Sequence, residues 1–498
     1  MSFLKKLASD SAIYGLNSIL GRSINFLLVF IHTRAFLPDE TAIIVELYAM
    51  VTFLNVLYTY GMETTFFRFA TKEKENFQSV YNISQTALIT STAFFTILII
   101  LFSNDFILAL NYPGQGYIIV LLAFIIGLDT IVAIPFARLR LENKAKKYVT
   151  IRLSSIAINV FLNVFFLWFC KNISEGKMLV SLQPIISKIY FPALGVGYIV
   201  IANLLANLIY IPLLWEELVN KFSFYFDKKQ FTKMWEYGYP ILILGLAGMV
   251  NLQFDRIMLR QILPDGFYQG LSNESVIGIY GNCYKLSVLI SLATQSFRFA
   301  ADPLFFSKAE DKSAPSLFAE VTKWFTLFCC ILWVAICLNL DIISTIFIGK
   351  SFRSGIGIVP LLLLGNVLLG IYNNLAVWFK ITDKTKFGTY ITFFGAVINV
   401  LLNYILIPKI GYMGCAWAFM ISALAMTVLC YFLGNKFFPV PYNVRTIMGY
   451  LAGSTLLIWL NSFVIIPNIW VSMGFHGVIF ILFLTIIVVI ERHRILPK

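Results

Sequence analysis

The chain has 498 residues, of which 59% are apolar, 16% are aromatic and 13% are charged, and its formal net charge is +13. An average soluble domain is roughly 45–50% apolar and about 25% charged, so this composition excludes soluble enzymes, disordered scaffolds and nucleic-acid-binding domains. The excess of basic residues therefore indicates loops that face a membrane surface, and we expect no nucleic-acid partner.

Runs of about 20 mostly apolar residues predict membrane-spanning helices, because about 20 residues of helix cross the hydrocarbon core. In chain order they lie near residues 11–36, 41–62, 80–103, 116–137, 149–169, 193–215, 237–258, 274–296, 320–340, 356–379, 387–407, 411–433, 446–466 and 473–490. The sequence therefore predicts an all-α polytopic membrane protein with 14 transmembrane helices.

The distribution of Lys and Arg tests this map, since cytoplasmic loops carry an excess of both. With the N-terminus inside, the inner segments hold 25 of these residues and the outer segments hold 7. A missed or invented helix would scramble this alternation from that point on. We therefore expect both termini to be cytoplasmic.

Short motifs recur in the same order in the two halves of the chain. The matched pairs are 34–39 with 260–265, 67–70 with 297–300, and 158–163 with 398–403. Six predicted spans separate the copies, an even number, so both halves have the same topology. This indicates two pseudo-symmetric six-helix bundles in a parallel repeat, an arrangement that transporters use.

The repeat also predicts the domain boundaries. We expect an N-terminal six-helix bundle at 1–215, a cytoplasmic linker at 216–236, a C-terminal six-helix bundle at 237–435, and accessory helices 13 and 14 at 436–498.

Charged residues within the predicted spans are the candidate functional residues, because each costs about 2.5–3.5 kcal/mol at a helix centre unless it faces a wet cavity. Spans 1 and 7 are equivalent in the repeat, so their polar faces would line one central cavity. The candidates for substrate binding are Arg22, Asn25, Asn251, Arg256 and Lys285. The candidates for ion or proton coupling are Asp255, Glu46 and Asp129, and the secondary candidates are Arg34 and Arg298.

Structural roles compete with these functional ones. Asp255 and Arg256 would also serve as an ion pair that fixes helix packing, and Lys285 would also serve as the partner of an acid. Arg34 and Arg298 lie near span ends, from which long basic side chains reach the headgroups. Paired asparagines such as Asn159 and Asn163 are typical of hydrogen bonding between helices.

We find no motif typical of catalysis, no set of residues with metal-ligand spacing and no nucleotide-binding Gly-rich loop. The 7 cysteines lie in or beside apolar runs, as small buried side chains do. We therefore expect neither an enzyme nor a cofactor.

Several segments resemble a known family. They are Tyr14–Arg22 followed by Thr33–Asp39, Ile134–Arg140, Asp255–Leu259 with Ile277–Tyr280, and Leu402–Pro408 with Gly411 and Gly414. Together they are similar to bacterial polysaccharide (O-antigen type) flippases of the multidrug/oligosaccharidyl-lipid/polysaccharide exporter superfamily, to which lipid II flippases also belong. Arg22, Asp255 and Arg256 match cavity positions of this pattern.

The resemblance implies alternating access by two bundles in a bacterial inner membrane. The substrate would be an undecaprenyl-pyrophosphate-linked oligosaccharide, moved from the cytoplasmic to the outer leaflet during surface polysaccharide or lipopolysaccharide synthesis. The expected partners are this lipid-linked glycan, membrane lipids, and a glycan polymerase, ligase or glycosyltransferases. Lipid II flipping and cation-coupled multidrug export remain alternatives, although drug export favours a cavity in which acids dominate.

Overall fold

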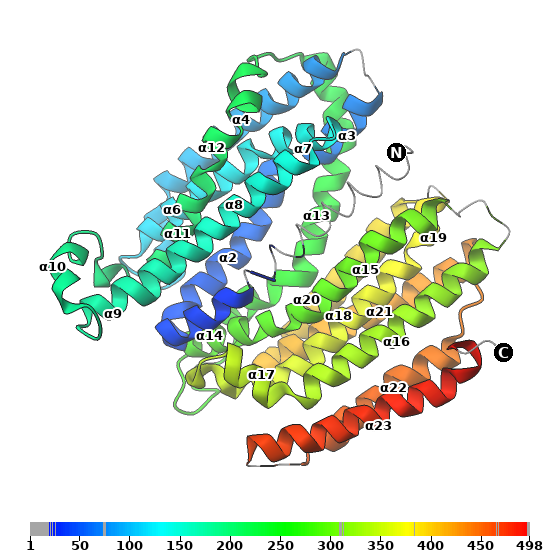
Figure 1. Ribbon diagram of the computed structural model, residues 1–498. Coiled ribbons are helices and arrows are strands. Elements are labelled where there is room, and N and C mark those ends of the chain that lie inside the picture. Colours follow the sequence, from blue (N-terminus) through cyan, green and yellow to red (C-terminus); the bar gives the residue numbers. More distant parts are fainter. Residues whose placement is uncertain are drawn as a thin grey trace. The chain divides into compact units, whose positions relative to one another are not determined.

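A computed structural model of the chain describes residues 19, 21, 23–24, 26–72, 76–307, 311, 313–382, 384–464, 466 and 468–495. All regular secondary structure within these ranges is helical (Figure 1), so the prediction of an all-α protein is confirmed. In the first half the helices are α2 (Pro38–Thr59), α3 (Met62–Lys72), α4 (Phe77–Leu101), α5 (Ser103–Ala109), α6 (Gly116–Ile131), α7 (Ala133–Leu141), α8 (Ala145–Val164), η2 (Phe165–Cys170), α9 (Lys171–Ser174), η3 (Val180–Leu182), α10 (Gln183–Ile186), η4 (Pro192–Leu194), α11 (Gly197–Leu208), α12 (Tyr210–Leu213) and η5 (Glu216–Asn220).

The second half is built in the same way from long helices and short turns. Its helices are α13 (Lys228–Ile262), α14 (Asn273–Tyr284), η6 (Lys285–Ser287), α15 (Val288–Ser307), α16 (Ala314–Leu338), α17 (Leu340–Phe347), η7 (Lys350–Ile358), α18 (Val359–Leu375), α19 (Val377–Ile381), α20 (Lys386–Ile410), α21 (Tyr412–Phe437), α22 (Val444–Asn461) and α23 (Ile469–Ile495).

The long helices match the predicted spans. Within the described ranges, 11 helices are long and apolar enough to cross a membrane, and each coincides with a predicted span. The shorter apolar helices Phe26–Ala35 and Gly197–Leu213 coincide with spans 1 and 6. Helix α22, with 18 residues, coincides with span 13. The polytopic architecture follows from the absence of water in the bilayer core, where a helix satisfies its own backbone hydrogen bonds.

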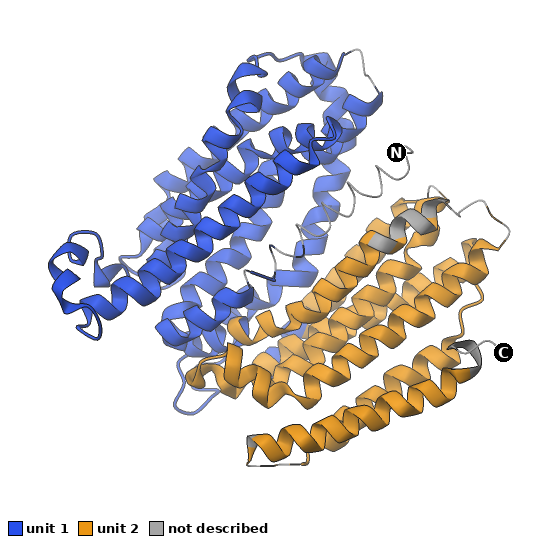
Figure 2. Cartoon of the chain, viewed as in Figure 1, with its two compact units in different colours: residues 1–281, 403–411 blue, residues 282–402, 412–498 orange. Residues whose placement is uncertain are grey.

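The chain divides into two compact units, which are coloured separately in Figure 2. Unit 1 comprises residues 1–281 and 403–411, and unit 2 comprises residues 282–402 and 412–498. Unit 1 thus contains α13, most of α14 and the end of α20, in addition to all the elements that precede them. The domain boundaries drawn from the sequence repeat remain predictions.

Unit 1 is centred on α2, which packs against α4, α6 and α13, while α11 packs against α6 and α8. Aromatic and aliphatic side chains fill the space between α3, α4 and α7, among them Phe66, Tyr81 and Ile134, which are all fully buried. Close helix contacts occur at glycines. A Cβ at Gly238 would lie 3.0 Å from Thr65 Oγ1, so α13 approaches α3 closely at this point.

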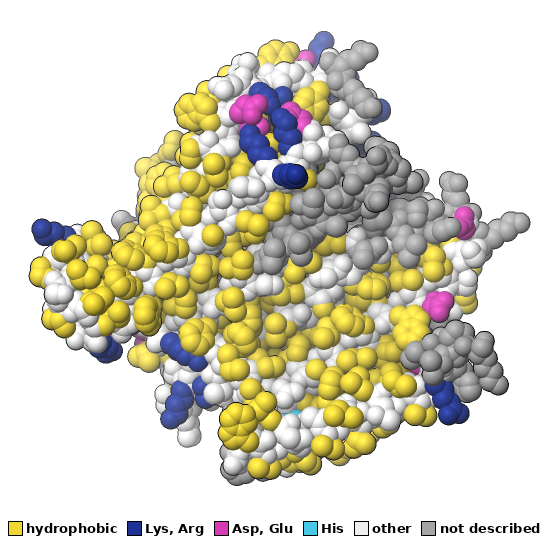
Figure 3. Space-filling model, in the orientation of Figure 1, with side chains coloured by type: hydrophobic (Ala, Val, Ile, Leu, Met, Phe, Trp, Pro, Cys, Tyr) yellow, Lys and Arg dark blue, Asp and Glu magenta, His cyan; other side chains and the backbone are white. Residues whose placement is uncertain are grey.

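At one end of unit 1, which we call its basic end, the segment after α12 is held against the bundle by ion pairs. Lys147 Nζ of α8 lies 2.8 Å from an oxygen of the fully buried Glu217, and Lys221 Nζ lies 3.8 Å from Glu142, which follows α7. The Tyr81 hydroxyl donates to the Glu217 carbonyl at 2.7 Å. Figure 3 shows Lys, Arg, Asp and Glu side chains gathered here, near α7 and α12. The segment is therefore fastened to the bundle before α13 begins.

Unit 2 packs α18 against α15, α16 and α21, and α22 and α23 lie against α16. Gly365 lets α18 approach α21, because a Cβ there would lie 2.5 Å from the Phe419 ring. Lys323 of α16 and Glu491 of α23 form an ion pair at 2.5 Å in which both side chains are buried. The hydroxyl of Tyr450 on α22 also donates to Glu491. This cluster joins both accessory helices to α16.

Candidate functional site

The predicted pair on α13 forms a buried cluster with α14. Arg256 Nη1 lies 3.2 Å from Asp255 Oδ1 and donates to the Leu252 carbonyl at 2.9 Å. The Tyr280 hydroxyl of α14 donates to Asp255 Oδ2. One turn earlier, Asn251 Nδ2 donates to the Ala247 carbonyl at 3.2 Å. The three predicted residues of this helix are therefore buried together, with Asp255 as the acceptor that links α13 to α14.

Glu46 of α2 belongs to a second charged cluster, which is centred on Arg260 of α13. Arg260 Nη1 lies 2.6 Å from Glu274 Oε1 of α14, and Arg260 Nη2 donates to the Leu110 carbonyl at 2.9 Å. Arg260 Nε lies 3.7 Å from Glu46 Oε1, and the Glu46 side chain is 1% exposed. The Tyr112 ring lies 5.1 Å from the guanidinium carbon. One guanidinium therefore faces two carboxylates that come from different helices.

A polar pocket lies beside the second cluster, at the end of unit 1 where α2 begins and α13 finishes. Its volume is about 340 Å³, and it is lined by Asn111, Arg260, Asp265, Gly266, Leu271, Ser272, Asn273 and Glu274. We call this end of unit 1 the distal end.

Asp129 of α6 belongs to a third cluster within unit 1. It accepts a hydrogen bond from Asn207 Nδ2 of α11 at 3.1 Å, and Asn207 Oδ1 accepts one from Ser155 of α8 at 3.3 Å. Arg152 of α8 donates to the Tyr210 hydroxyl at 3.3 Å. Three helices thus share one hydrogen-bonded network around a single carboxylate.

The expected role of asparagines as contacts between helices is seen at Asn163 of α8. Its Oδ1 lies 2.8 Å from His32 Nε2, and its Nδ2 donates to Asn159 Oδ1 at 2.9 Å. His32 and Asn163 are both buried. These side chains therefore satisfy one another inside the bundle.

The remaining predicted site residues are dispersed. Lys285 lies in the short turn η6, where its Nζ donates to Asn282 Oδ1 at 3.1 Å. Arg34 is exposed and its guanidinium lies 3.8 Å from the centre of the Phe30 ring, and Arg298 on α15 is exposed. Arg22 and Asn25 lie outside the described residues.

Sequence reasoning missed the partners of the acids rather than the acids themselves. The candidates for the site did not include Arg260, Tyr280, Glu274 or Asn207. The signal for Arg260 and Glu274 was present, since opposite charges end one span and begin the next. Among the described residues, no group of three His, Cys, Asp or Glu side chains could hold a metal ion.

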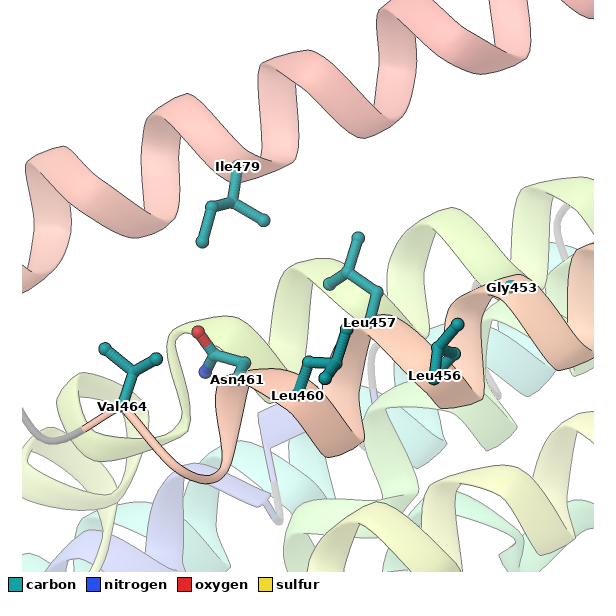
Figure 4. A pocket seen from close by; sticks show the side chains of 7 residues that line it. All are labelled: Gly453, Leu456, Leu457, Leu460, Asn461, Val464 and Ile479. Carbon is teal, nitrogen blue, oxygen red and sulfur yellow. The ribbon is translucent and has the colours of Figure 1, made fainter.

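An apolar pocket of about 340 Å³ lies between the accessory helices of unit 2 (Figure 4). It is lined by Gly453, Leu456, Leu457, Leu460, Asn461, Val464 and Ile479. Apart from the Asn461 amide, the lining side chains are suited to hydrocarbon rather than to a charged group.

Comparisons with known proteins bear on the whole chain. Residues 7–309 match a family model described as polysaccharide biosynthesis protein, and residues 278–405 match the MatE model. A search of curated proteins finds no match.

Three solved structures of similar fold are distant in sequence from this chain. The lipid II flippase MurJ in an inward closed conformation aligns with a TM-score of 0.72 at 14% identity, over 97% of this chain and 99% of that chain. An inward-facing multidrug resistance MATE transporter of the MOP superfamily aligns with a TM-score of 0.65 at 12% identity, over 86% of this chain and 96% of that chain. A MOP superfamily transporter from Pyrococcus furiosus, described as having a binding pocket of reverse polarity, aligns with a TM-score of 0.56 at 13% identity, over 86% and 95%. The fold is therefore that of MOP superfamily transporters.

Proposed function

Because the chain belongs to the polysaccharide biosynthesis protein family, we propose that it flips a polyprenyl-pyrophosphate-linked oligosaccharide across a bacterial inner membrane. The glycan lipid would move from the cytoplasmic to the outer leaflet by alternating access between the two predicted bundles, 1–215 and 237–435. The family match over residues 7–309 is the observation that carries this proposal.

The buried charges support a pyrophosphate-bearing substrate. Arg256 is 6% exposed at membrane depth, and a guanidinium offers a rigid fork of donors that suits phosphate oxygens. Arg22 and Lys285 are the further cations we assign to the headgroup, with Asn25 and Asn251 as hydrogen-bonding residues for the glycan. Since Asp255 holds Arg256 in the described conformation, substrate binding requires that the phosphate compete with this carboxylate.

The membrane potential is a sufficient source of free energy for this movement. The free energy falls by roughly 2.3 kcal/mol for each 100 mV and for each negative charge that leaves an inside-negative compartment, and the pyrophosphate carries about two such charges. The Asp129 cluster is a candidate for coupling to an ion or proton, because its carboxylate is joined to Asn207 inside the bundle. Collapse of the potential at a constant pH gradient should slow flipping, and unchanged flipping would contradict a potential-driven mechanism.

The test is a flipping assay in proteoliposomes that contain a lipid-linked oligosaccharide, with the protein at matched levels. We expect Arg22→Ala and Arg256→Ala to reduce flipping at least tenfold, and Arg256→Lys to retain part of it, because Lys keeps the charge but not the fork. Arg445→Ala serves as the matched control, since this arginine is exposed at the start of α22 and is not a candidate for the site. Normal flipping by both alanine variants would refute the pyrophosphate role.

Lipid II flipping is the second candidate function, favoured by the alignment with MurJ over 97% of this chain. Parallel assays with lipid II and with a longer lipid-linked oligosaccharide separate the two substrates. Drug export, suggested by the MATE structures, would instead appear as reduced accumulation of a cationic dye in cells that express the protein.

The proposal also assigns an orientation and partners. With the basic end of unit 1 in the cytoplasm, both termini are cytoplasmic and the distal end faces the outer leaflet. Glycosyltransferases would supply the substrate on the inner face, and a glycan polymerase or ligase would consume it on the outer face.

A further inference from the structure

The polar pocket at the distal end, which we call the distal pocket, lies between two loops of unit 1. Asn111 lines it from the loop 110–115, which joins α5 to α6, and other lining residues come from the loop 263–272, which joins α13 to α14. Its volume of about 340 Å³ is at the lower end of the roughly 300–1,000 Å³ range of small-molecule sites. The distal pocket therefore suits a ligand of about the size of a single ring.

The loop 263–272 is held in shape at its base by the first residue of α14. Asn273 Nδ2 donates to the Leu263 carbonyl at 3.3 Å and to Asp265 Oδ1 at 2.9 Å. Both ends of the loop are thus tied to one side chain. A wall that is formed before a ligand arrives lowers the entropic cost of binding.

The lining offers hydrogen-bonding atoms that the protein itself does not use. Among the residues that the structure describes, no group donates to Asn273 Oδ1 or to Asp265 Oδ2, and the side-chain amide of Asn111 has no hydrogen-bond partner. Amide and carboxylate oxygens accept hydrogen bonds from hydroxyl groups, and an amide NH₂ group donates to hydroxyl oxygens. The distal pocket therefore presents donors and acceptors that match a ligand rich in hydroxyl groups.

The charges around the distal pocket favour a neutral ligand. Arg260 lies 2.6 Å from Glu274 and 3.7 Å from Glu46, and Asp265 adds a third carboxylate to this single cation. An anion would therefore meet an excess of negative charge. An apolar ligand would leave the polar lining atoms unpaired. Because Arg260 pairs with Glu274, Asp265 is the one carboxylate of the described lining that remains for a metal ion, whereas Ca²⁺ takes about 6–8 oxygen ligands.

We propose that the distal pocket binds one neutral sugar residue of the glycan at the outer face of the membrane, with Asp265, Asn273 and Asn111 as its hydrogen-bonding residues. In the orientation of the proposed function the distal end faces the outer leaflet, so the glycan reaches this pocket on the side to which it is moved. The pocket recognises the sugar, whereas the cations at membrane depth bind the pyrophosphate. This inference rests on the proposed function and names a further contact to the same substrate.

The test measures the binding of free sugars to the full chain in nanodiscs by saturation-transfer NMR, without polyprenyl lipid and without glycoside detergent. The neutral probes are the methyl glycosides of glucose, galactose, mannose and N-acetylglucosamine, and glucuronic acid is the anionic counterpart. We expect at least one neutral probe to bind with millimolar affinity. Glucuronic acid should bind about tenfold more weakly or not at all, because its carboxylate meets the negative lining.

Variants assign the binding to this pocket. Asp265→Ala should weaken it about tenfold or more, because a hydrogen bond to a charged group is lost. Asn111→Gly should weaken it about threefold to tenfold and keep the backbone conformation, since φ is 58° at this residue and glycine adopts such values freely. Gln269→Ala is the matched control, because Gln269 is exposed in the same loop and does not line the pocket.

Three results would overturn the proposal: binding of none of the neutral probes, stronger binding of glucuronic acid, or equal affinities in Asp265→Ala, Asn111→Gly and Gln269→Ala. Because the assay contains no lipid-linked substrate, it reports on the distal pocket alone. Failure of the flipping assay would refute the proposed function and leave this readout unchanged, and failure of sugar binding would leave the flipping assay unchanged as a test of the pyrophosphate role.

Discussion

Removal of the Lys323 ammonium should destabilise unit 2 strongly. Lys323 and Glu491 are 2% and 5% exposed, and their charged atoms are 2.5 Å apart. In Lys323→Met, Glu491 would remain buried without the ammonium group that it faces, while the Tyr450 hydroxyl still donates to it. Breaking a buried pair in this way costs about 3–5 kcal/mol, which is more than a hundredfold in the unfolding equilibrium.

The assay is unfolding in detergent at constant protein concentration for Lys323→Met, Glu491→Gln and the double variant. The double variant should regain most of the lost stability, because it contains no unpaired charge and its amide oxygen still accepts from Tyr450. Lys177→Met is the control, since Lys177 and Glu175 are also 2.5 Å apart but are 65% and 36% exposed. An exposed pair contributes about 0–1 kcal/mol. Equal effects of Lys323→Met and Lys177→Met, or additive effects in the double variant, would refute the reasoning.

Three further predictions concern the pH dependence of one carboxylate and the stability contributed by helix contacts within each unit. Hydrogen bonds from Lys221 and Lys147 lower the pKa of Glu216 to about 2 from 4.5. The stability that this carboxylate contributes is therefore present above about pH 4.5 and is lost as the pH falls towards 2. Pepsin cleavage of residues 216–227 should increase over this interval, and in Lys221→Ala the increase should begin at a higher pH. Gly365→Ala should lower stability by about 1–3 kcal/mol, because its Cβ would lie 2.5 Å from the Phe419 ring. Gly453→Ala on α22 should raise stability by about 0.5–1 kcal/mol, because an added Cβ would meet no atom outside its own stretch of helix within 4 Å; the two midpoints of thermal unfolding should move in opposite directions. Asn163→Ala should cost about 1–3 kcal/mol, because it removes the partner that lies 2.8 Å from the buried His32, and a loss no larger than that of Asn172→Ala, whose hydrogen bond is exposed, would contradict this value.

The charged residues show how far sequence reasoning reaches. Glu46, Asp129, Asp255 and Arg256 were identified because a charge within an apolar run is visible in the sequence. The partner Tyr280 was not identified, since a tyrosine is not unusual in its own segment, whereas Asn207 belongs to the paired asparagines expected to join helices and does so. Lys323 and Glu491 are 168 residues apart, and nothing in either segment indicates that α16 and α23 are neighbours.

Gly278 is a similar case. The segment that contains it contributed to the family resemblance, but a glycine within an apolar helix has many explanations. Only the tertiary structure shows that the Pro38 carbonyl oxygen occupies the position that a Cβ at Gly278 would take.

The sequence by itself determined that this protein is a bundle of membrane helices and where most of them begin and end. It could do so because a helix in lipid satisfies its backbone within one segment, so length and apolarity are local properties. Only the tertiary structure decided which charges meet, with Asp255 beside Tyr280, Arg260 between Glu46 and Glu274, and Glu491 against Lys323. These pairings depend on which faces of distant helices come together, and that is set by side-chain packing across the whole bundle rather than by any single segment.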